Sequence, residues 1–133
     1  MPHKIHDIGV AAQIGKYSDA VETAPNLRWL HTSGTPGLET NGNLTSGITG
    51  QSETAWKHIL HMLEQAGMTV ADVVKVTQYL TRAEDIPAYA KVRTQYLGDA
   101  RPASMLLVVN QLVRPEFLVE VEIIAAKAKS KTT

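Results

Sequence analysis

The chain has 133 residues, of which 44% are apolar and 20% charged, values typical of a single globular domain and incompatible with a disordered or collagen-like chain. Thirteen Lys and Arg balance thirteen Asp and Glu, so no net charge favours binding to nucleic acid or to an anionic membrane. The chain contains no Cys, which excludes disulfides, Cys-ligated zinc and a thiol nucleophile.

Hydropathy along the chain bears on the compartment. The N-terminal sequence MPHKIHDIGVAAQIGKY lacks the apolar stretch of a signal peptide, and the longest aliphatic run, residues 106–109, is too short to span a bilayer. We therefore expect a soluble, cytoplasmic protein with no membrane partner. One domain is expected over residues 1–133, with flexible ends at 1–4 and 127–133.

The N-terminal half predicts strands, a long loop and a helix. Two or three strands are expected before the loop, the clearest over 27–33, where polar and large residues alternate before the turn sequence SGTPG. Five glycines separated by Ser, Thr and Asn make 34–50 the loop most suited to carry function. A helix over 48–66 follows, because Trp56, Ile59 and Leu63 recur at helical spacing.

The C-terminal half alternates strands with one more helix. Residues 73–80 are β-branched and aromatic without a helical period, which predicts a largely buried strand. A second helix begins at Asp85-Ile86-Pro87 and ends at Gly98, since Pro is favoured in the first helical turn. Two further strands, 104–109 and 117–126, are expected to pair as a closing hairpin.

Together these elements predict an α+β domain with one mixed sheet and both helices on one face. The other face of the sheet then has no cover within the chain. An uncovered aliphatic sheet face marks a subunit interface, so the pattern predicts a homo-oligomer.

The last strand places two carboxylates on one face. Period two puts Val119, Val121 and Ile123 on one side, and Glu120 and Glu122 on the other. Residues two apart on a strand lie about 6.5–7 Å apart, so one ionised carboxylate raises the pKa of its neighbour and prepares it for proton transfer. A solvated strand face or two salt bridges explains the same pattern, and the pattern alone favours that simpler explanation.

Other candidate groups carry weaker signals. His58, His61 and Glu64 share a helix face, but without an HExxH motif or a second ligand cluster a solvated face is favoured and no metal is expected. The glycine-rich loop contains neither GxxxxGK[ST] nor GxGxxG, so nucleotide binding is not indicated. Arg101 is suited either to bind a substrate carboxylate or to pair with Asp99.

Several segments together resemble one known family. They are Ile14-Gly15-Lys16-Tyr17, His31-Thr32-Ser33-Gly34, Ala66-Gly67-Met68, Asp72-Val73-Val74-Lys75-Val76-Thr77 and Val119-Glu120-Val121-Glu122. The segments occur in the family's order over residues 5–126, and the closing VEVEIIAA is specific to it. The chain resembles the Rid family, also called the YjgF or RutC family.

The resemblance implies a chorismate-mutase-like α+β fold, with a six-stranded mixed sheet and two helices packed on one face. It also implies a homotrimer whose sheets form a central barrel, with a small-molecule substrate in clefts between subunits. Family members hydrolyse reactive enamines and imines, such as 2-aminoacrylate from pyridoxal-phosphate enzymes, to a 2-keto acid and ammonia. No cofactor and no metal are expected.

The resemblance assigns four residues of this chain to the cleft. Glu120 is implied to position or activate the attacking water. Tyr17, Ser33 and Gly34 are implied to line the cleft around the substrate.

The family's carboxylate-binding arginine does not carry over to this chain. The family places it directly before the Ser that starts the fifth strand, and that position is Ala103 here. Counting back from Glu120 without gaps gives Met105, which is no arginine either. Arg101 is the candidate to replace it, with Arg93 on the second helix as a less favoured substitute.

The departure at this position leaves three functions open. Loss of a charge-assisted bond to a carboxylate forfeits about 1.5–3 kcal/mol per bond, so an imine hydrolase with an altered substrate is the leading hypothesis. A non-catalytic trimer that binds a small metabolite is the first alternative. An endoribonuclease or translation inhibitor is the second, supported only by the lysines at 127, 129 and 131 and opposed by the zero net charge.

Overall fold

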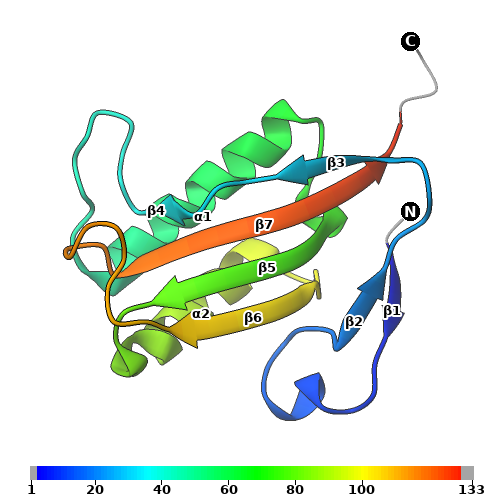
Figure 1. The fold of residues 1–133 in the computed structure, drawn as a ribbon, viewed down its shortest axis with the longest axis horizontal. Helices are drawn as coiled ribbons and strands as arrows, with labels where there is room; N and C mark the ends of the chain where they lie inside the picture. The colour runs from blue at the N-terminus through cyan, green and yellow to red at the C-terminus, as the bar shows by residue number, and fades with distance from the viewer. Residues whose placement is uncertain (1–2, 130–133) are drawn as a thin grey trace.

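The computed structural model describes residues 3–129 of the chain as one α+β domain (Figure 1). The strands are β1 Lys4–His6, β2 Ala20–Glu22, β3 Leu27–His31, β4 Thr35–Pro36, β5 Val73–Leu80, β6 Ala103–Val108 and β7 Val119–Ala128. The helices are α1 Gly47–Gln65 and α2 Ile86–Leu97, and three short 3₁₀ turns lie at Ala11–Gln13, Val70–Asp72 and Ala83–Asp85. The prediction of 73–80 as a strand is confirmed, and the first helix begins and ends one residue earlier than predicted.

The main sheet is mixed and has the order β3-β7-β5-β6, with β4 paired to β7 beyond the end of β3. Strands β5 and β6 are parallel, and the other neighbours are antiparallel. The expectation of one six-stranded sheet is wrong in its strand count. Five strands form this sheet, and β1 and β2 form a separate hairpin. An isolated parallel bridge joins Ser18, two residues before β2, to Ala103 of β6.

The predicted closing hairpin is also wrong, because β5 lies between β6 and β7. The chain leaves β5, passes through α2 and returns as β6 parallel to β5, as a helical crossover requires. The remaining edge of β5 is then open to β7, which runs antiparallel to it. Residues 109–118 connect β6 to β7 and pass the end of β5 on the way (Figure 1).

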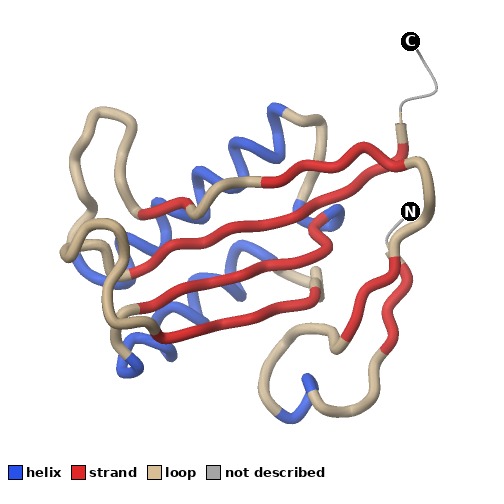
Figure 2. The backbone as a smooth tube through the Cα atoms, viewed as in Figure 1, coloured by secondary structure: helices blue, strands red, loops and turns tan. Residues whose placement is uncertain are grey.

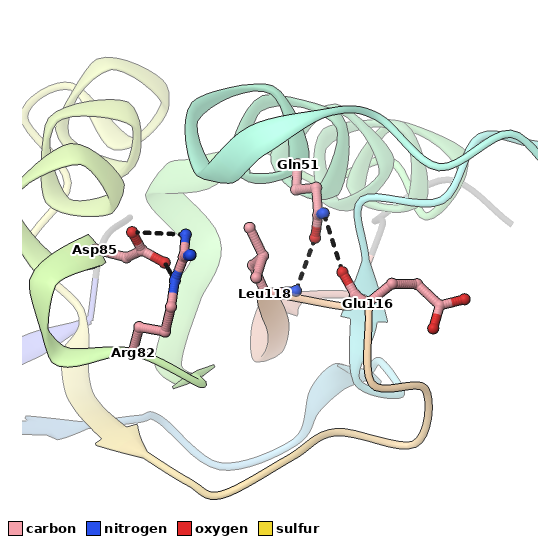
Figure 3. A network of polar contacts seen from close by, with 5 residues as sticks. All are labelled: Gln51, Arg82, Asp85, Glu116 and Leu118. Carbon is pink, nitrogen blue, oxygen red and sulfur yellow. Dashed lines mark hydrogen bonds and ion pairs between the residues drawn. The ribbon is translucent and has the colours of Figure 1, made fainter.

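A single side chain of α1 anchors that connection. Gln51 donates from Nε2 to the carbonyl of Glu116 at 3.3 Å, and its Oε1 accepts from the backbone N–H of Leu118 at 2.8 Å (Figure 3). On the neighbouring turn Arg82 and Asp85 form an ion pair at 2.8 Å. The two bonds of Gln51 hold the backbone directly before the start of β7.

Both helices pack against the same face of the sheet, as predicted (Figure 2). The core joins α1, α2 and the two central strands β5 and β7. Its largest fully buried side chains are Trp56, Tyr89, Ile59, Leu63, Leu80, Ile123, Gln78, Val76, Val119 and Val121. Strand β7 alternates buried and half-buried residues from Val119 to Ile124, so its apolar side faces the helices.

One polar network lies inside this core, centred on Gln78 of β5. Its Oε1 accepts from the Tyr89 hydroxyl at 2.7 Å and from Arg93 at 3.1 Å. Its Nε2 donates to the Ser104 hydroxyl at 3.0 Å and to the Met105 carbonyl at 2.9 Å. The side chain is fully buried, and these four bonds fasten β6 and α2 to β5.

The ends that were expected to be flexible, 1–4 and 127–133, lie partly outside the described residues. Lys4 begins β1, and β7 continues through Ala128. Residues 1–2 and 130–133 lie outside the described residues. Across the described part of the chain, no helix combines the length and apolar character needed to cross a membrane.

Candidate functional site

The face of the sheet away from the helices carries the candidate site. Cross-strand partners share a face, so the register places on it Glu120, Glu122 and Ile124 of β7, Lys75, Thr77 and Tyr79 of β5, Ala103, Met105 and Leu107 of β6, and Trp29 and His31 of β3. Trp29, Met105 and Leu107 are exposed by 48%, 51% and 38%. We call this surface the open face.

Glu120 lies at the end of the open face where Ser33 and Gly34, between β3 and β4, run alongside β7. Its strand neighbours are Tyr79 on β5 and Pro36 on β4. A Cβ added to Gly34 would lie 2.5 Å from Oε1 of Glu120, so only glycine permits the carboxylate this position. The structure therefore brings together Gly34 and Glu120, two of the residues that the sequence nominated, and Ser33 adjoins Gly34 in the chain.

The second carboxylate of β7 is held by a residue that the sequence analysis missed. Tyr79 donates its hydroxyl to Oε1 of Glu122 at 2.9 Å, and this bond raises the pKa of the Tyr79 hydroxyl. The Glu120 carboxylate forms no hydrogen bond with the side chains or backbone of residues 3–129. Burial raises the pKa of Glu120, and the charge of Glu122 raises it further.

The shifted pKa suits Glu120 to proton transfer. A carboxyl that is partly desolvated beside a second negative charge holds its proton to a higher pH than a free carboxyl. The alternative of two salt bridges on this strand face does not describe these groups, since no ion pair among residues 3–129 includes either glutamate. The prediction that Glu120 and Glu122 share one face of the strand is confirmed.

Tyr17 and Arg101 belong to a second group at the start of β6. The N–H of Ser18 donates to the Pro102 carbonyl at 3.1 Å, and the Ser18 hydroxyl donates to the carbonyl of Arg101. The β6 residue level with Glu120 is Leu107, four residues beyond Ala103. Four residues of strand span about 13 Å, so one protomer does not bring the two groups together.

Neither candidate arginine is directed at the open face. The Arg101 guanidinium donates to the carbonyls of Gly98 and Ala100 at 2.8 and 2.9 Å, closing the end of α2. It also lies in the wall of a largely apolar pocket of about 390 Å³ between the β1–β2 hairpin and the start of β5. Arg93 bonds Gln78 on the helix side of the sheet. The predicted pairing of Arg101 with Asp99 is not among the ion pairs of the described residues.

The remaining candidates have local partners. His58 hydrogen-bonds to the carbonyl of Leu38 at 2.8 Å, while His61 contacts Gln65 at 3.2 Å. No cluster of three His, Cys, Asp or Glu side chains suited to a metal ion occurs within residues 3–129. Of the basic tail, Lys127 donates to the carbonyl of Gly67 at 3.1 Å, and Lys131 lies outside the described residues.

Comparison with known proteins identifies relatives over almost the whole chain. The family model described as Endoribonuclease L-PSP matches residues 9–127. A RutC family protein of Pyrococcus abyssi is 32% identical over 116 residues, covering 86% of this chain and 88% of the relative. A protein of Mus musculus named 2-iminobutanoate/2-iminopropanoate deaminase is 31% identical over 118 residues, covering 87% and 84%.

Solved structures agree with these matches. A conserved Rid family protein of unknown function from Yersinia pestis superposes with a TM-score of 0.83 at 27% identity, covering 96% of this chain and all of that one. A structure named as a putative endoribonuclease from Thermotoga maritima superposes at 0.72 with 32% identity, covering 95% and 94%. With a family model matched over 9–127 and the fold in agreement, the chain belongs to the Rid family, whose members are also called RutC proteins.

Proposed function

We propose that this protein hydrolyses small reactive imines and enamines to a carbonyl compound and ammonia, with Glu120 as the group that directs water. The observation that carries the proposal is the Glu120 carboxylate, which lies against Gly34 on the open face with a raised pKa and no described hydrogen-bond partner. Relatives of similar sequence are named 2-iminobutanoate/2-iminopropanoate deaminases, which supports the same class of reaction.

The reaction needs one group that accepts and then returns a proton. Ionised Glu120 takes a proton from water as the water oxygen attacks the imine carbon. The same carboxyl then gives that proton to the nitrogen, which leaves a carbon bearing a hydroxyl and an amine. It next moves the hydroxyl proton to the amine as the carbon–nitrogen bond breaks, and ammonia and the carbonyl product leave. Water supplies the oxygen and both hydrogens, so the step requires no cofactor. Burial and the charge of Glu122 raise the pKa of Glu120, so its carboxyl holds a proton more readily than a free carboxyl does.

We propose further that the complete site lies between two copies of the chain in a homotrimer. The Glu120 and Tyr17 groups lie at opposite ends of one sheet, so a small substrate reaches both only when a second copy brings the missing group. The exposed apolar side chains of the open face, Trp29, Met105 and Leu107, are suited to burial in such an assembly. The cytoplasm is the compartment we propose, since pyridoxal-phosphate enzymes release such imines there.

A trimer that binds a small metabolite without turning it over is the alternative that one observation favours. Ala103 occupies the position implied for the family arginine, and Arg101 and Arg93 are bonded elsewhere in the protomer. A carboxylate-bearing imine then lacks the guanidinium fork that would orient it for attack.

The decisive experiment measures ammonia and keto-acid release from 2-iminopropanoate generated in the assay by a pyridoxal-phosphate enzyme. Wild type is compared with Glu120→Gln and with Glu64→Gln, a control on the exposed side of α1. We expect the Glu120 variant to lose at least about 100-fold in kcat/KM, as general bases typically contribute that much. The control should keep wild-type rates.

The same preparations separate the two proposed functions. Absence of turnover on imines with and without a carboxylate, together with binding that survives Glu120→Gln, would establish the binding trimer. Light scattering should give three times the 14.5 kDa of the chain, and a monomer would contradict the site between copies.

A further inference from the structure

All five arginines of the chain are engaged in contacts within the protomer. Arg28 donates to the Ala66 carbonyl at 3.0 Å, Arg82 pairs with Asp85, Arg93 donates to Gln78, Arg101 donates to Gly98 and Ala100, and Arg114 lies over the Phe117 ring at 5.5 Å. None of these contacts is on the open face. A cation that binds a substrate carboxylate there has to be another residue.

Lys75 of β5 is the cation that the register places at the required position. It is directly paired with Ala103 on one side and with Ile124 on the other. It shares the open face with Thr77 and Tyr79, because Val76 and Gln78 between them face the helices and are fully buried. Paired residues of adjacent strands lie about 4.8 Å apart, so the lysine side chain rises beside the methyl group of Ala103.

The surroundings leave the Lys75 ammonium available. The side chain is half-buried, and none of the ion pairs within residues 3–129 includes it. Glu122 is two residues from Ile124 on the neighbouring strand. Its carboxylate already accepts a hydrogen bond from the Tyr79 hydroxyl. An arginine at 103 would share the same face and crowd this space, whereas alanine leaves it open to the lysine.

We propose that Lys75 binds the carboxylate of a small 2-imino acid, in the place of the arginine that Ala103 lacks. This inference rests on the proposed function and defines its substrate class. In the assembly, Lys75 and Tyr17 of one copy hold the carboxylate end of the substrate, and Glu120 of the next copy directs water at the imine carbon. An ammonium is a point charge without the planar fork of a guanidinium, so it holds the carboxylate with less control of orientation. We expect the site to accept a wider range of side chains for that reason.

The first test measures binding without requiring turnover. Pyruvate and its methyl ester are titrated into wild type, Lys75→Met, Lys75→Arg and the control Lys91→Met, in which an exposed lysine of α2 is changed. Loss of the charge should weaken pyruvate binding by about 10- to 100-fold, the range of one charge-assisted bond. Methyl pyruvate binding should change less than about twofold, and Lys75→Arg and Lys91→Met should bind pyruvate as wild type does. Equal pyruvate affinity in Lys75→Met and wild type would overturn the proposal.

The second test measures kinetics and locates Lys75 relative to Glu120. For 2-imino acids, Lys75→Met should raise KM by about 10- to 100-fold and change kcat by less than about threefold, a split that a loss of folding would not produce. Trimers assembled from equal amounts of Glu120→Gln and Lys75→Met chains should regain about a quarter of wild-type activity at low substrate, because about a quarter of their clefts then carry both native residues. Failure of the mixed trimers to recover activity would contradict a site shared between copies.

The two tests distinguish failure of the Lys75 carboxylate site from failure of the proposed imine hydrolysis. If wild type hydrolyses no imine, the proposed hydrolysis is wrong, while selective loss of pyruvate binding in Lys75→Met still supports the carboxylate site. If wild type hydrolyses 2-imino acids and Lys75→Met does so with an unchanged KM, the hydrolase stands and the role of Lys75 is refuted.

Discussion

The two faces of the central sheet are built from the same strands and differ in how their polar groups are satisfied. On the helix side, Gln78 makes four hydrogen bonds among fully buried apolar side chains. On the open face, Glu120 lies beside a second carboxylate, and large apolar side chains are exposed. One side of each strand therefore stabilises the fold, and the other carries a partly buried carboxylate with a raised pKa and exposed apolar side chains.

Removing Gln78 should have the largest effect on the fold. In Gln78→Leu the Tyr89 hydroxyl, the Arg93 guanidinium and the Ser104 hydroxyl stay in place without their shared partner, a situation that costs about 3 kcal/mol of unfolding free energy. Denaturant unfolding at a fixed protein concentration measures the loss. Thr77→Val, the preceding residue on the opposite face, should cost less than about 1 kcal/mol, and equal losses in both variants would refute the contrast between the faces.

Adding one methyl group at Gly34 should impair the open face while leaving the fold intact. The Cβ of Gly34→Ala would lie 2.5 Å from Oε1 of Glu120, so the carboxylate has to rotate out of position. We expect kcat to fall about 10- to 100-fold, as misplacement of a reacting group by about 1 Å does. In the Glu120→Gln background the same methyl group should cause no further loss. Additive losses in the double variant would show that Gly34 acts independently of Glu120.

The smallest predicted effect concerns the pH dependence of stability. The pKa of Glu120 is raised in the folded protein, so between its ordinary value of 4.5 and the raised value the folded state binds more protons than the unfolded state. Stability contributed by this group therefore falls as pH rises through that window. Glu120→Gln should melt about 1–2 °C above wild type at pH 8 and level with it near pH 4. A constant offset between Glu120→Gln and wild type at every pH would contradict the assignment.

The alternation of side chains in 119–124 was sufficient to place Glu120 and Glu122 on one face of the sheet, because period two depends only on a strand being present. The role given to Glu120 came from the family resemblance. The residue paired with Glu120 across the sheet, Tyr79, could not be predicted in the same way. Tyr79 and Lys75 lie in a strand that was predicted correctly, yet their relation to Glu122 and Ala103 depends on which strands are neighbours. The predicted hairpin made 104–109 the neighbour of 117–126, whereas β5 lies between them. Because β5 was not placed beside 117–126, Tyr79 and Lys75 were not recognised as neighbours of Glu122 and Ala103.

By itself, the sequence determined the helices, the buried strand 73–80, the two-sided character of β7 and the membership of the family, since these depend on local periodicity and on motifs in chain order. Only the tertiary structure decided the strand order and the bonding of every arginine within the protomer. It also placed Lys75 beside Ala103 and brought Gly34 against Glu120. The reason is physical: pairing between distant strands is set by the closure of long loops and by packing across the whole core, which no window of neighbouring residues contains.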